Sequence, residues 1–425
     1  MAEVQSILEK RVQFNVSLCK KSNGTKINLE RAAQNIVDLQ RGLTGSRALA
    51  GNAYMQKAAS LQSYLLYYWP VSYAQTAAAL GMTTNFFERV QKIKGRTIRI
   101  LDLGSGPAPA SCSIADLAQG KGERNMSFEF SLLDSSGDAL SLGKRILEGA
   151  FAKSARVETY VCNFEKVFGQ KKSAQAAPAF LANKKFDFIV ASHSLNELWK
   201  NEKKRGQKIV GMLQSLSACL EDGGLLILME PALLATSRAL MEVRDALAGL
   251  GLGLVSPCPK SFFPCPALEN PNATCHYQFD WEMPKIVADL AALAKLNRAD
   301  VKMTFFVFER GAALGQEYGF GNDDNSLQDK EAAASPVPDF SNIYALVVSE
   351  PMLNKAGRIR YLLCDGKSRF SLSAKNGDPI AAAQNFFSLR RYDKVQVMNP
   401  QVRSQKDEPL SLGFEERTRL EIQRL

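Results

Sequence analysis

A short glycine-containing turn is the part of this sequence best suited to bind a small ligand. Residues 98–111 begin as an apolar strand, Ile-Arg-Ile-Leu-Asp-Leu, that breaks at Gly104-Ser105-Gly106 into a helical segment. Gly104 and Gly106 permit positive φ and let a ligand approach the main chain without meeting a Cβ atom. The following helix presents unpaired N–H groups above the turn. The carboxylate of Asp102 suits a ligand that carries an ammonium group.

The spacing within this turn separates two ligand classes. A dinucleotide fold favours G-x-G-x-x-G, but Pro109 stands where the last glycine would be. The D-x-G-x-G pattern resembles motif I of class I S-adenosylmethionine (SAM) methyltransferases, whose cofactor has a positive aminocarboxylate end and no phosphates. A glycine turn inside an ordinary α/β domain is the alternative that the motif alone leaves open.

Two further strands follow at the spacing that such a fold needs. Residues 128–134 are apolar and end in Asp134, and a carboxylate at this place can accept hydrogen bonds from both ribose hydroxyls. Residues 157–163 end in Asn163, which we expect to meet the adenine edge. The order of these strands predicts a SAM fold.

A fourth strand begins at residue 186 and runs into a polar loop, and a fifth spans residues 223–230. We expect the loop residues Ser192, His193, Asn196 and Glu197 to cap the next helix and shape the pocket, with catalysis as the alternative. The chain has no N/D-P-P-Y/F loop for exocyclic amines and no cysteine just after the fourth strand for pyrimidine C5 methylation. The acceptor atom and the catalytic residues are therefore not assigned. The expected cofactor-binding residues are Asp102, Gly104, Ser105, Gly106, Asp134, Asn163 and Ser192.

The chain is long enough for several domains, and its pattern indicates an α/β protein. We expect an N-terminal helical region (1–95), a Rossmann-like SAM-binding domain (96–310) with a Cys/Pro-rich metal-binding insertion (253–283), a linker (311–339) and a small C-terminal β-rich unit (340–425). Within the first region, Asn28 is expected to cap a helix, and residues 60–80 are interpreted as a buried helix pair. In the C-terminal unit, strands are expected near residues 343–348, 359–364 and 370–374.

The basic residues are concentrated at the two ends of the chain. The net charge is +10, and the excess lies in residues 1–99 and 351–425. Basic flanks favour a nucleic-acid partner, although a solvated basic surface is the alternative. Candidate contacts are Arg358, Arg360, Lys367, Arg369, Arg390 and Arg391.

No uncharged run reaches the length of a membrane span, so no membrane partner is expected. The first residues include Glu3 and Glu9 and lack a continuous apolar stretch. A cytoplasmic location with reduced cysteines is therefore expected.

Three cysteines lie close together in a proline-rich segment, residues 257–281, and a fourth follows much later. Cys258, Cys265, Cys275 and Cys364 could ligate zinc or an iron–sulfur cluster, since thiolates suit both. The prolines are expected to exclude regular helix or sheet. Cys258 and Cys265 each precede proline and lack the C-x2-C spacing of structural zinc sites, which favours a 4Fe-4S cluster. Zinc, or no metal, remains open. His276, beside Cys275, is interpreted as a hydrogen-bonding neighbour.

Several of these motifs together resemble a known family. The segments Tyr-Tyr-Trp-Pro-Val-Ser-Tyr-Ala (67–74), Leu-Asp-Leu-Gly-Ser-Gly-Pro (101–107) and Ser-His-Ser-Leu-Asn-Glu-Leu (192–198), with the Cys-Pro pairs and the late Cys364, are similar to the methyltransferase-like family associated with the mitochondrial small ribosomal subunit and its bacterial relatives. The resemblance implies a 4Fe-4S cluster on Cys258, Cys265, Cys275 and Cys364. It also implies a role in maturation of the small ribosomal subunit. The sequence departs from the usual glycine-rich loop at Ala108-Pro109.

Three functions follow as hypotheses. The favoured one is a SAM-dependent, iron–sulfur-containing methyltransferase acting on the small ribosomal subunit or its rRNA. The second is an assembly factor that binds RNA and SAM without methyl transfer. The third is a small-molecule methyltransferase, which would not need basic flanks. We expect a monomer when the protein is off the ribosome, and the mitochondrial matrix is the alternative location.

Overall fold

The computed structural model describes residues 2–23, 27–45, 54–83, 86–93, 95–120, 126–169, 178–259, 264–312, 341–403 and 410–424. The chain divides into two compact units. The first comprises Met1–Ser256 with Thr274–Ala313, and the second comprises Pro257–Ala273 with Leu314–Leu425. From residue 313 onward, the expected linker lies outside the described residues.

The first unit is built on an eight-stranded mixed sheet with the order β3-β2-β1-β4-β5-β8-β6, in which β7 also pairs with β8. Strands β1 to β5 run parallel to one another, and β8 runs antiparallel to both β5 and β6. This confirms the five strands expected from the sequence. Their bounds are β1 (Ile98–Leu103), β2 (Phe128–Asp134), β3 (Ala155–Val161), β4 (Phe186–Ser192), β5 (Leu220–Glu230), β6 (Gly253–Ser256), β7 (Tyr277–Asp280) and β8 (Asp300–Glu309).

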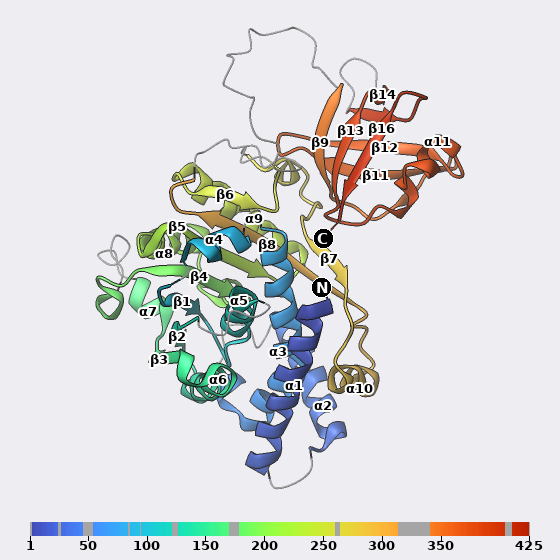
Figure 1. Ribbon diagram of the computed structural model, residues 1–425. Helices are drawn as coiled ribbons and strands as arrows, with labels where there is room; N and C mark the ends of the chain where they lie inside the picture. The colour runs from blue at the N-terminus through green and yellow to red at the C-terminus, as the bar shows by residue number, and fades with distance from the viewer. Residues whose placement is uncertain are drawn as a thin grey trace. The chain divides into compact units, whose positions relative to one another are not determined.

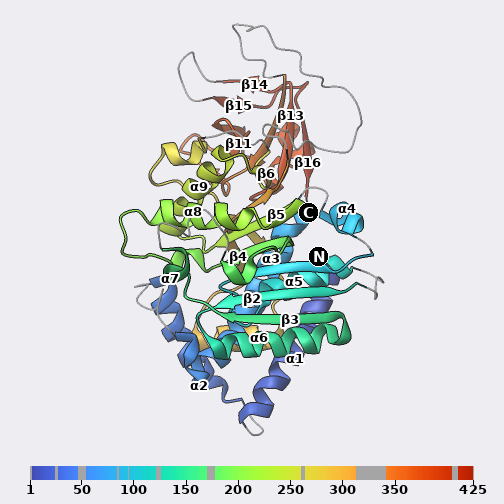
Figure 2. The same cartoon turned by 90° about the vertical axis from the view of Figure 1, so that its left-hand side faces the viewer.

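Helices cover both faces of this sheet (Figures 1 and 2). The strand order reverses between β1 and β4. Right-handed crossovers therefore place α5 (Pro109–Gln119) and α6 (Gly137–Phe151) on one face, and α8 (Arg205–Ser217) and α9 (Leu234–Gly249) on the other. The apolar strand residues are buried between these layers, with Ile98, Ile100 and Leu101 fully buried. The crevice at the reversal point is where folds of this kind bind ligands.

The N-terminal region is helical, as expected, and packs on α5 and α6. It contains α1 (Ala2–Asn23), α2 (Leu29–Gln40), α3 (Ala58–Gly81) and α4 (Phe86–Ile93). The side chain of Asn28 caps α2 by accepting a 2.8 Å hydrogen bond from the Arg31 amide, which confirms the predicted cap. Arg11 of α1 and Tyr73 of α3 both bind Asp116 of α5. None of the described helices is long and apolar enough to cross a membrane.

Two expectations for local structure were wrong. Residues 60–80 form one continuous helix, α3, with Pro70 inside it rather than a helix pair. Packing of this almost wholly buried helix offsets the hydrogen bond that proline removes. The proline-rich segment contains regular sheet at its end, where β7 pairs with β8. Residues 277–280 carry no proline, so their amides can join the ladder.

The second unit contains a separate eight-stranded sheet with the order β14-β15-β12-β11-β9-β13-β16, in which β10 also pairs with β11. The three expected strands are confirmed, and the sheet is larger than the sequence indicated. A short helix, α11 (Pro379–Ala383), lies between β12 and β13 in the chain. The bounds are β9 (Asn342–Val347), β10 (Met352–Leu353), β11 (Arg358–Cys364), β12 (Arg369–Lys375), β13 (Lys394–Met398), β14 (Gln401–Val402), β15 (Ser411–Gly413) and β16 (Arg419–Gln423).

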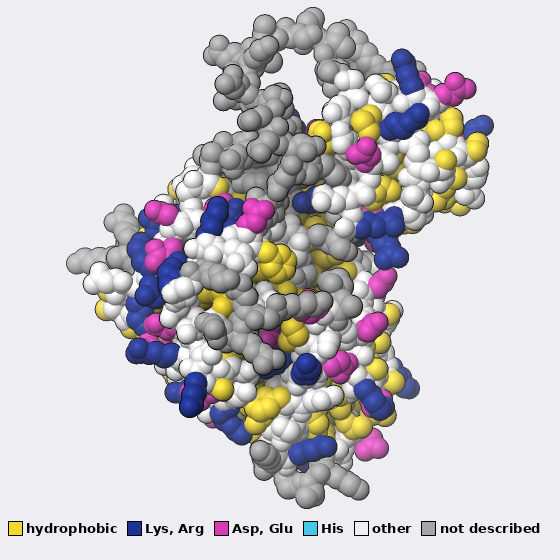
Figure 3. All heavy atoms as spheres, viewed as in Figure 1, with side chains coloured by type: hydrophobic (Ala, Val, Ile, Leu, Met, Phe, Trp, Pro, Cys, Tyr) yellow, Lys and Arg dark blue, Asp and Glu magenta, His cyan; other side chains and the backbone are white. Residues whose placement is uncertain are grey.

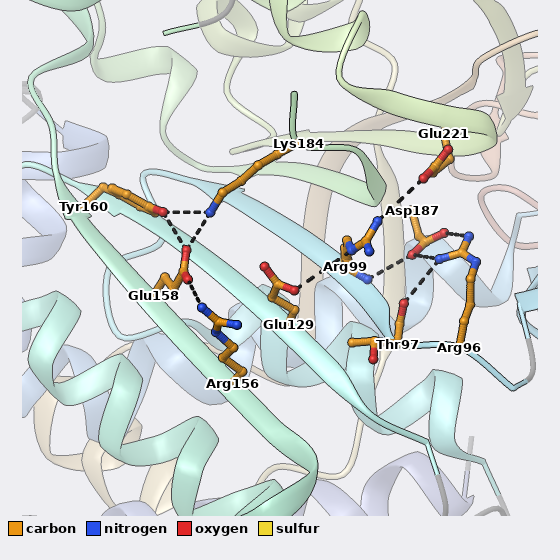
Figure 4. Close-up of polar contacts among 10 residues, drawn as sticks. All are labelled: Arg96, Thr97, Arg99, Glu129, Arg156, Glu158, Tyr160, Lys184, Asp187 and Glu221. Carbon is orange, nitrogen blue, oxygen red and sulfur yellow. Dashed lines mark hydrogen bonds and ion pairs between the residues drawn. The ribbon is translucent and has the colours of Figure 1, made fainter. Parts of the chain in front are cut away.

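Ion pairs join the amino-terminal ends of the parallel strands (Figure 4). Both guanidinium NH groups of Arg96 bind the buried carboxylate of Asp187, at 2.5 and 2.9 Å. Arg99 reaches Glu129 on one side and Glu221 on the other. These contacts tie β1, β2, β4 and β5 together at the edge opposite the carboxyl-terminal crevice. This network is therefore structural rather than part of the candidate site.

Candidate cofactor site

The turn after β1 adopts the backbone that its glycines allow. Gly104 and Gly106 have φ values of 69° and 51°, and Ala108 has φ 59° although it carries a side chain. A Cβ atom on Gly104 would lie 2.4 Å from Cβ of Ser194, in the loop after β4. Three alternate residues of the turn are thus left-handed, and the first of them has no room for a side chain.

Asp134 lies beside this turn at the end of β2. Its Oδ2 accepts a 2.8 Å hydrogen bond from the Gly106 amide, and its Oδ1 accepts one of 2.8 Å from the Ser136 amide. Burial raises the pKa of this carboxyl, while the amide hydrogen bonds act in the opposite direction. A carboxylate has about four lone-pair positions, so Asp134 keeps capacity for a diol ligand.

Asp102 is buried beneath the turn rather than beside the cavity described below. Its Oδ2 accepts a 2.7 Å hydrogen bond from Ser111 Oγ, in the first turns of α5, and the side chain is 1% exposed. Burial raises the pKa of Asp102 to about 7. The structure therefore gives Asp102 a partner within the fold, and its predicted contact with an ammonium group stays a prediction.

A cavity of about 1030 Å³ opens at the carboxyl-terminal ends of β1, β2, β3 and β4, within the first unit. Five of the predicted cofactor residues line it, whereas Asp102 and Ser105 do not. The five are Gly104, Gly106, Asp134, Asn163 and Ser192. Asn163 also caps α7 (Phe164–Phe168) by accepting a 3.0 Å hydrogen bond from the Lys166 amide. Residues far apart in the sequence therefore meet at one site.

The N-terminal helix α3 forms a wall of this cavity, which the sequence interpretation missed. Its lining residues are Tyr64, Tyr68, Val71, Ser72 and Gln75. The sequence indicates that residues 60–80 are buried, and Tyr67, Trp69 and Tyr73 are indeed buried. The lining residues recur at helical spacing, and four of them carry polar atoms. That polar stripe is the signal that could have identified the wall.

Gln75 and His193 form a partly buried hydrogen-bonded pair in the cavity wall. Gln75 Nε2 donates to the Lys302 carbonyl at 3.0 Å, which directs Oε1 toward Nε2 of His193, 2.7 Å away. Because an amide oxygen can only accept, His193 must carry its proton on Nε2. Burial lowers the pKa of His193 to about 4, so the ring is neutral near pH 7. Its Nδ1 therefore holds a lone pair.

Three buried polar atoms near this loop have no hydrogen-bond partner within the described part of the chain. They are Ser192 Oγ, His193 Nδ1 and Glu230 Oε2. The other oxygen of Glu230 accepts a 2.9 Å hydrogen bond from the Asn196 amide. Burial raises the pKa of Glu230 to about 8. Buried polar atoms without partners are uncommon in folded proteins, and a ligand is one way to satisfy them.

The four predicted metal ligands all lie in described residues. Cys265 and Cys275 are buried, and Cys258 and Cys364 are half-buried. Cys275 belongs to the first unit, where its carbonyl accepts a 2.9 Å hydrogen bond from Thr304, and the other three belong to the second. Within the described ranges, no group of three or more His, Cys, Asp or Glu residues is arranged to hold a metal ion. The donor type suits a cluster, but the described geometry does not assemble one, so 4Fe-4S and zinc both stay predictions.

The fold and the site together define a class. Parallel strands in the order 3-2-1-4-5, an antiparallel strand inserted beyond β5, and a left-handed glycine turn after β1 form the Rossmann-like fold of class I SAM-dependent methyltransferases. The sequence profile of a family described as mitochondrial small ribosomal subunit Rsm22 matches residues 58–307, more than half of the chain. The chain belongs to this family. No curated protein sequence matches it significantly.

Solved structures with the same kind of fold include several methyltransferases. Precorrin-6y C5,15-methyltransferase from Geobacter metallireducens GS-15 shares 12% identity over 52% of this chain and 87% of its own, with a TM-score of 0.30. Magnesium protoporphyrin IX methyltransferase from Synechocystis PCC 6803, with bound SAH, shares 10% sequence identity over 66% of this chain and 100% of its own, with a TM-score of 0.32. These values are too low to support a function, and the strand order carries the fold assignment.

Proposed function

We propose that the cavity binds SAM and that the protein acts as a SAM-dependent methyltransferase. The observation that carries this proposal is the joint placement of Gly104, Gly106 and Asp134 on one cavity wall. A left-handed turn exposes main chain to the cofactor, and the carboxylate beside it can accept the ribose hydroxyls. The cavity, at about 1030 Å³, is as large as the larger ligand pockets of proteins. It therefore has room for a cofactor and part of an acceptor.

The loop after β4 limits what chemistry this chain can supply. SAM, when bound, supplies the methyl group on a sulfonium. His193 with a pKa of about 4 is a weak base near pH 7, and efficient general bases have a pKa near the working pH. We therefore propose that His193 Nδ1 accepts a hydrogen bond from a ligand group that bears a proton, and so orients that group. This fits methylation of an acceptor that needs alignment more than deprotonation.

We further propose that the acceptor belongs to the rRNA of the small ribosomal subunit. The family description names that subunit in mitochondria, which favours the mitochondrial matrix over the cytoplasm that the sequence led us to expect. The basic excess of the chain supports an RNA partner. A non-catalytic assembly factor that binds SAM and RNA is the alternative. A small-molecule methyltransferase is less favoured, because it needs no ribosomal partner.

We also propose that Cys258, Cys265, Cys275 and Cys364 ligate a 4Fe-4S cluster, with zinc as the alternative. Thiolate ligands and the absence of C-x2-C spacing support the cluster. The proline-rich segment from Pro257 to Ala273 groups with the C-terminal sheet in one compact unit, which places three of the four cysteines there. No catalytic role is assigned to this group.

Mass spectrometry of small-subunit rRNA tests the function. A strain that lacks the gene should lose one methyl group, and the wild-type gene should restore it. The Asp134→Ala gene should not restore it, because the variant loses the ribose acceptor. Unchanged methylation together with defective subunit assembly would favour the non-catalytic alternative. Unchanged methylation with normal assembly would remove the ribosomal proposal altogether.

A further inference from the structure

The C-terminal sheet closes on itself into a small barrel. Consecutive strands β15 and β16 pair with the two opposite sides of the sheet: β15 runs parallel to β12, and β16 runs antiparallel to β13. They are separated by a turn at residues 415–418, and they pair with the two end strands of the path β12-β11-β9-β13. Inward residues from these strands form a single apolar core, including Tyr361, Leu372, Val395, Leu412 and Leu420.

This connectivity is that of an OB-fold. Strands β9, β11 and β12 form an antiparallel meander, with the two-residue β10 between β9 and β11 in the chain, and β9 also pairs with β13. A helix, α11, follows the third strand, and Ala381 of α11 and Phe386 just after it are buried in the barrel core. The last strand then runs parallel to the third. OB-folds bind oligonucleotides on the face of their second and third strands, here β11 and β12. The strands of this barrel, β9 to β16, lie outside the residues that match the family.

The outward face of β11 and β12 is basic. Side chains alternate along each strand, so Tyr361 and Leu372 point inward while Arg358, Arg360 and Lys375 point outward. The outward positions of both strands contain no Asp or Glu. Arg360 and Lys375 are exposed and have no charged partner within the described part of the unit. Figure 3 shows Lys and Arg side chains on the visible face of this unit.

Two features concentrate positive charge on this face. Arg358 stands directly opposite Lys375 across the two strands, and like charges in that position destabilise a sheet. Next to them, Arg403 donates to the carbonyl and hydroxyl of Ser373 at 3.0 and 3.2 Å. Its guanidinium occupies the space that a Cβ on Gly413 would need, since that atom would lie 2.0 Å from Arg403 Cζ. Arg403 therefore adds a third positive charge next to Arg358 and Lys375.

We propose that this outward face, built from Arg358, Arg360, Lys375 and Arg403, binds the backbone of single-stranded RNA. Cations two residues apart on one strand lie about 7 Å apart, so they can follow successive phosphates. The outward positions of β11 and β12 carry no aromatic ring for base stacking, so contacts to phosphates dominate and sequence preference is weak. The choice of RNA over DNA rests on the proposed function at the ribosomal subunit. The proposal that this face binds a single strand does not depend on that function.

Fluorescence anisotropy with the full chain and a labelled oligouridine 12-mer tests this proposal. The wild type should bind with strong salt dependence. Arg360→Glu/Lys375→Glu should weaken binding at least tenfold and reduce the salt slope by about 1.4, since each phosphate contact contributes about 0.7 for a single strand. Lys285→Glu/Arg419→Glu makes the same charge change at exposed sites elsewhere and should change affinity less than threefold.

A second readout separates recognition from stability. Lys375→Glu replaces the repulsion with Arg358 by attraction, so it should raise the melting temperature of the unit while weakening oligouridine binding. A purely structural role for the pair would not couple these two changes in opposite directions.

The outcomes that overturn the proposal are distinct from failure of the proposed function. Equal losses in the two double variants, equal affinity for duplex RNA, or no oligouridine binding would each contradict the basic barrel face as a single-strand site. Equal affinity for oligothymidine would support single-strand binding and remove only the preference for RNA. Arg360→Glu/Lys375→Glu should bind SAM as the wild type does, because neither residue lines the cavity. A wild-type protein that binds oligouridine but not SAM would contradict the proposed SAM site and leave the RNA site intact.

Discussion

Gln75 Oε1 lies 2.7 Å from Nε2 of His193, a contact that joins the N-terminal helix α3 to the loop after β4. The orientation of the Gln75 amide is fixed because its nitrogen donates to the Lys302 carbonyl. The N-terminal helix α3 is therefore part of the candidate site. The contact also determines which ring nitrogen of His193 can face a ligand.

Ring tautomers measured by NMR test this arrangement. The chain contains two histidines, His193 and His276, so His276→Gln assigns both signals. His193 should stay neutral and protonated on Nε2 down to about pH 5, because burial lowers its pKa to about 4. In Gln75→Leu the ring should lose this fixed tautomer, and the protein should lose about 1–3 kcal/mol of stability. A His193 that titrates near pH 6.5 would contradict the buried pair.

The stability of the Glu230→Gln variant relative to wild type should increase as pH rises. Burial raises the folded pKa of Glu230 to about 8, above its unfolded value of about 4.3. The folded state thus holds this proton more tightly, and wild-type stability from this group falls as pH rises from about 4 to 8. Glutamine has no such proton, so urea unfolding at pH 5.5, 7 and 8.5 should show a growing gain, at most about 1.4 kcal/mol per pH unit. Glu88→Gln, an exposed substitution, is the control, and a pH-independent difference would argue against a protonated Glu230.

Ala108→Gly should leave the stability of the protein nearly unchanged, whereas Ala110→Gly should lower it. Relief of the left-handed backbone at Ala108, about 1–2 kcal/mol, offsets the lost methyl burial and the greater entropy of the unfolded chain. Ala110, equally buried but inside α5, has no strain to relieve and should lose about 1–2 kcal/mol as glycine. Equal losses in the two variants, measured by thermal unfolding, would mean that Ala108 is unstrained.

Anaerobic purification tests the predicted cluster. The protein should be brown, with broad absorbance near about 400 nm and about four irons per chain. Cys364→Ser should lose both signals, whereas Cys219→Ser, at a buried cysteine outside the predicted ligand set, should keep them. One zinc per colourless chain would show that the metal was misassigned. Protein without any metal would remove the site.

The parallel sheet was predictable because most of its strands are short apolar runs followed by glycine or polar residues. Asp134 and Gly104 could be assigned to the site for the same reason, since the carboxyl ends of parallel strands meet at one edge. The capping role of Asn163 and the partner of Asp102 were not predictable, because both depend on local hydrogen bonds that spacing does not encode.

The parts that the sequence did not predict depend on contacts between distant segments. The continuity of α3 through Pro70 depends on burial by neighbouring elements, which local propensity ignores. The role of Gln75 cannot be inferred from α3 alone, because it depends on contacts with His193 and Lys302, which are far away in the sequence. The barrel needed the pairing of β15 with β12, and Ser411–Gly413 is too short for a strand signal.

Isothermal calorimetry with SAM and S-adenosylhomocysteine tests the central claim most directly. The wild type should bind both ligands with one site per chain. Asp134→Ala should lose at least tenfold in affinity, because a well-placed hydrogen bond to a charged acceptor contributes about 1.5–3 kcal/mol, and Arg417→Ala, a fully exposed change, should bind normally. No heat with either ligand for the folded wild type, or equal affinities for wild type and Asp134→Ala, would contradict SAM binding in this cavity.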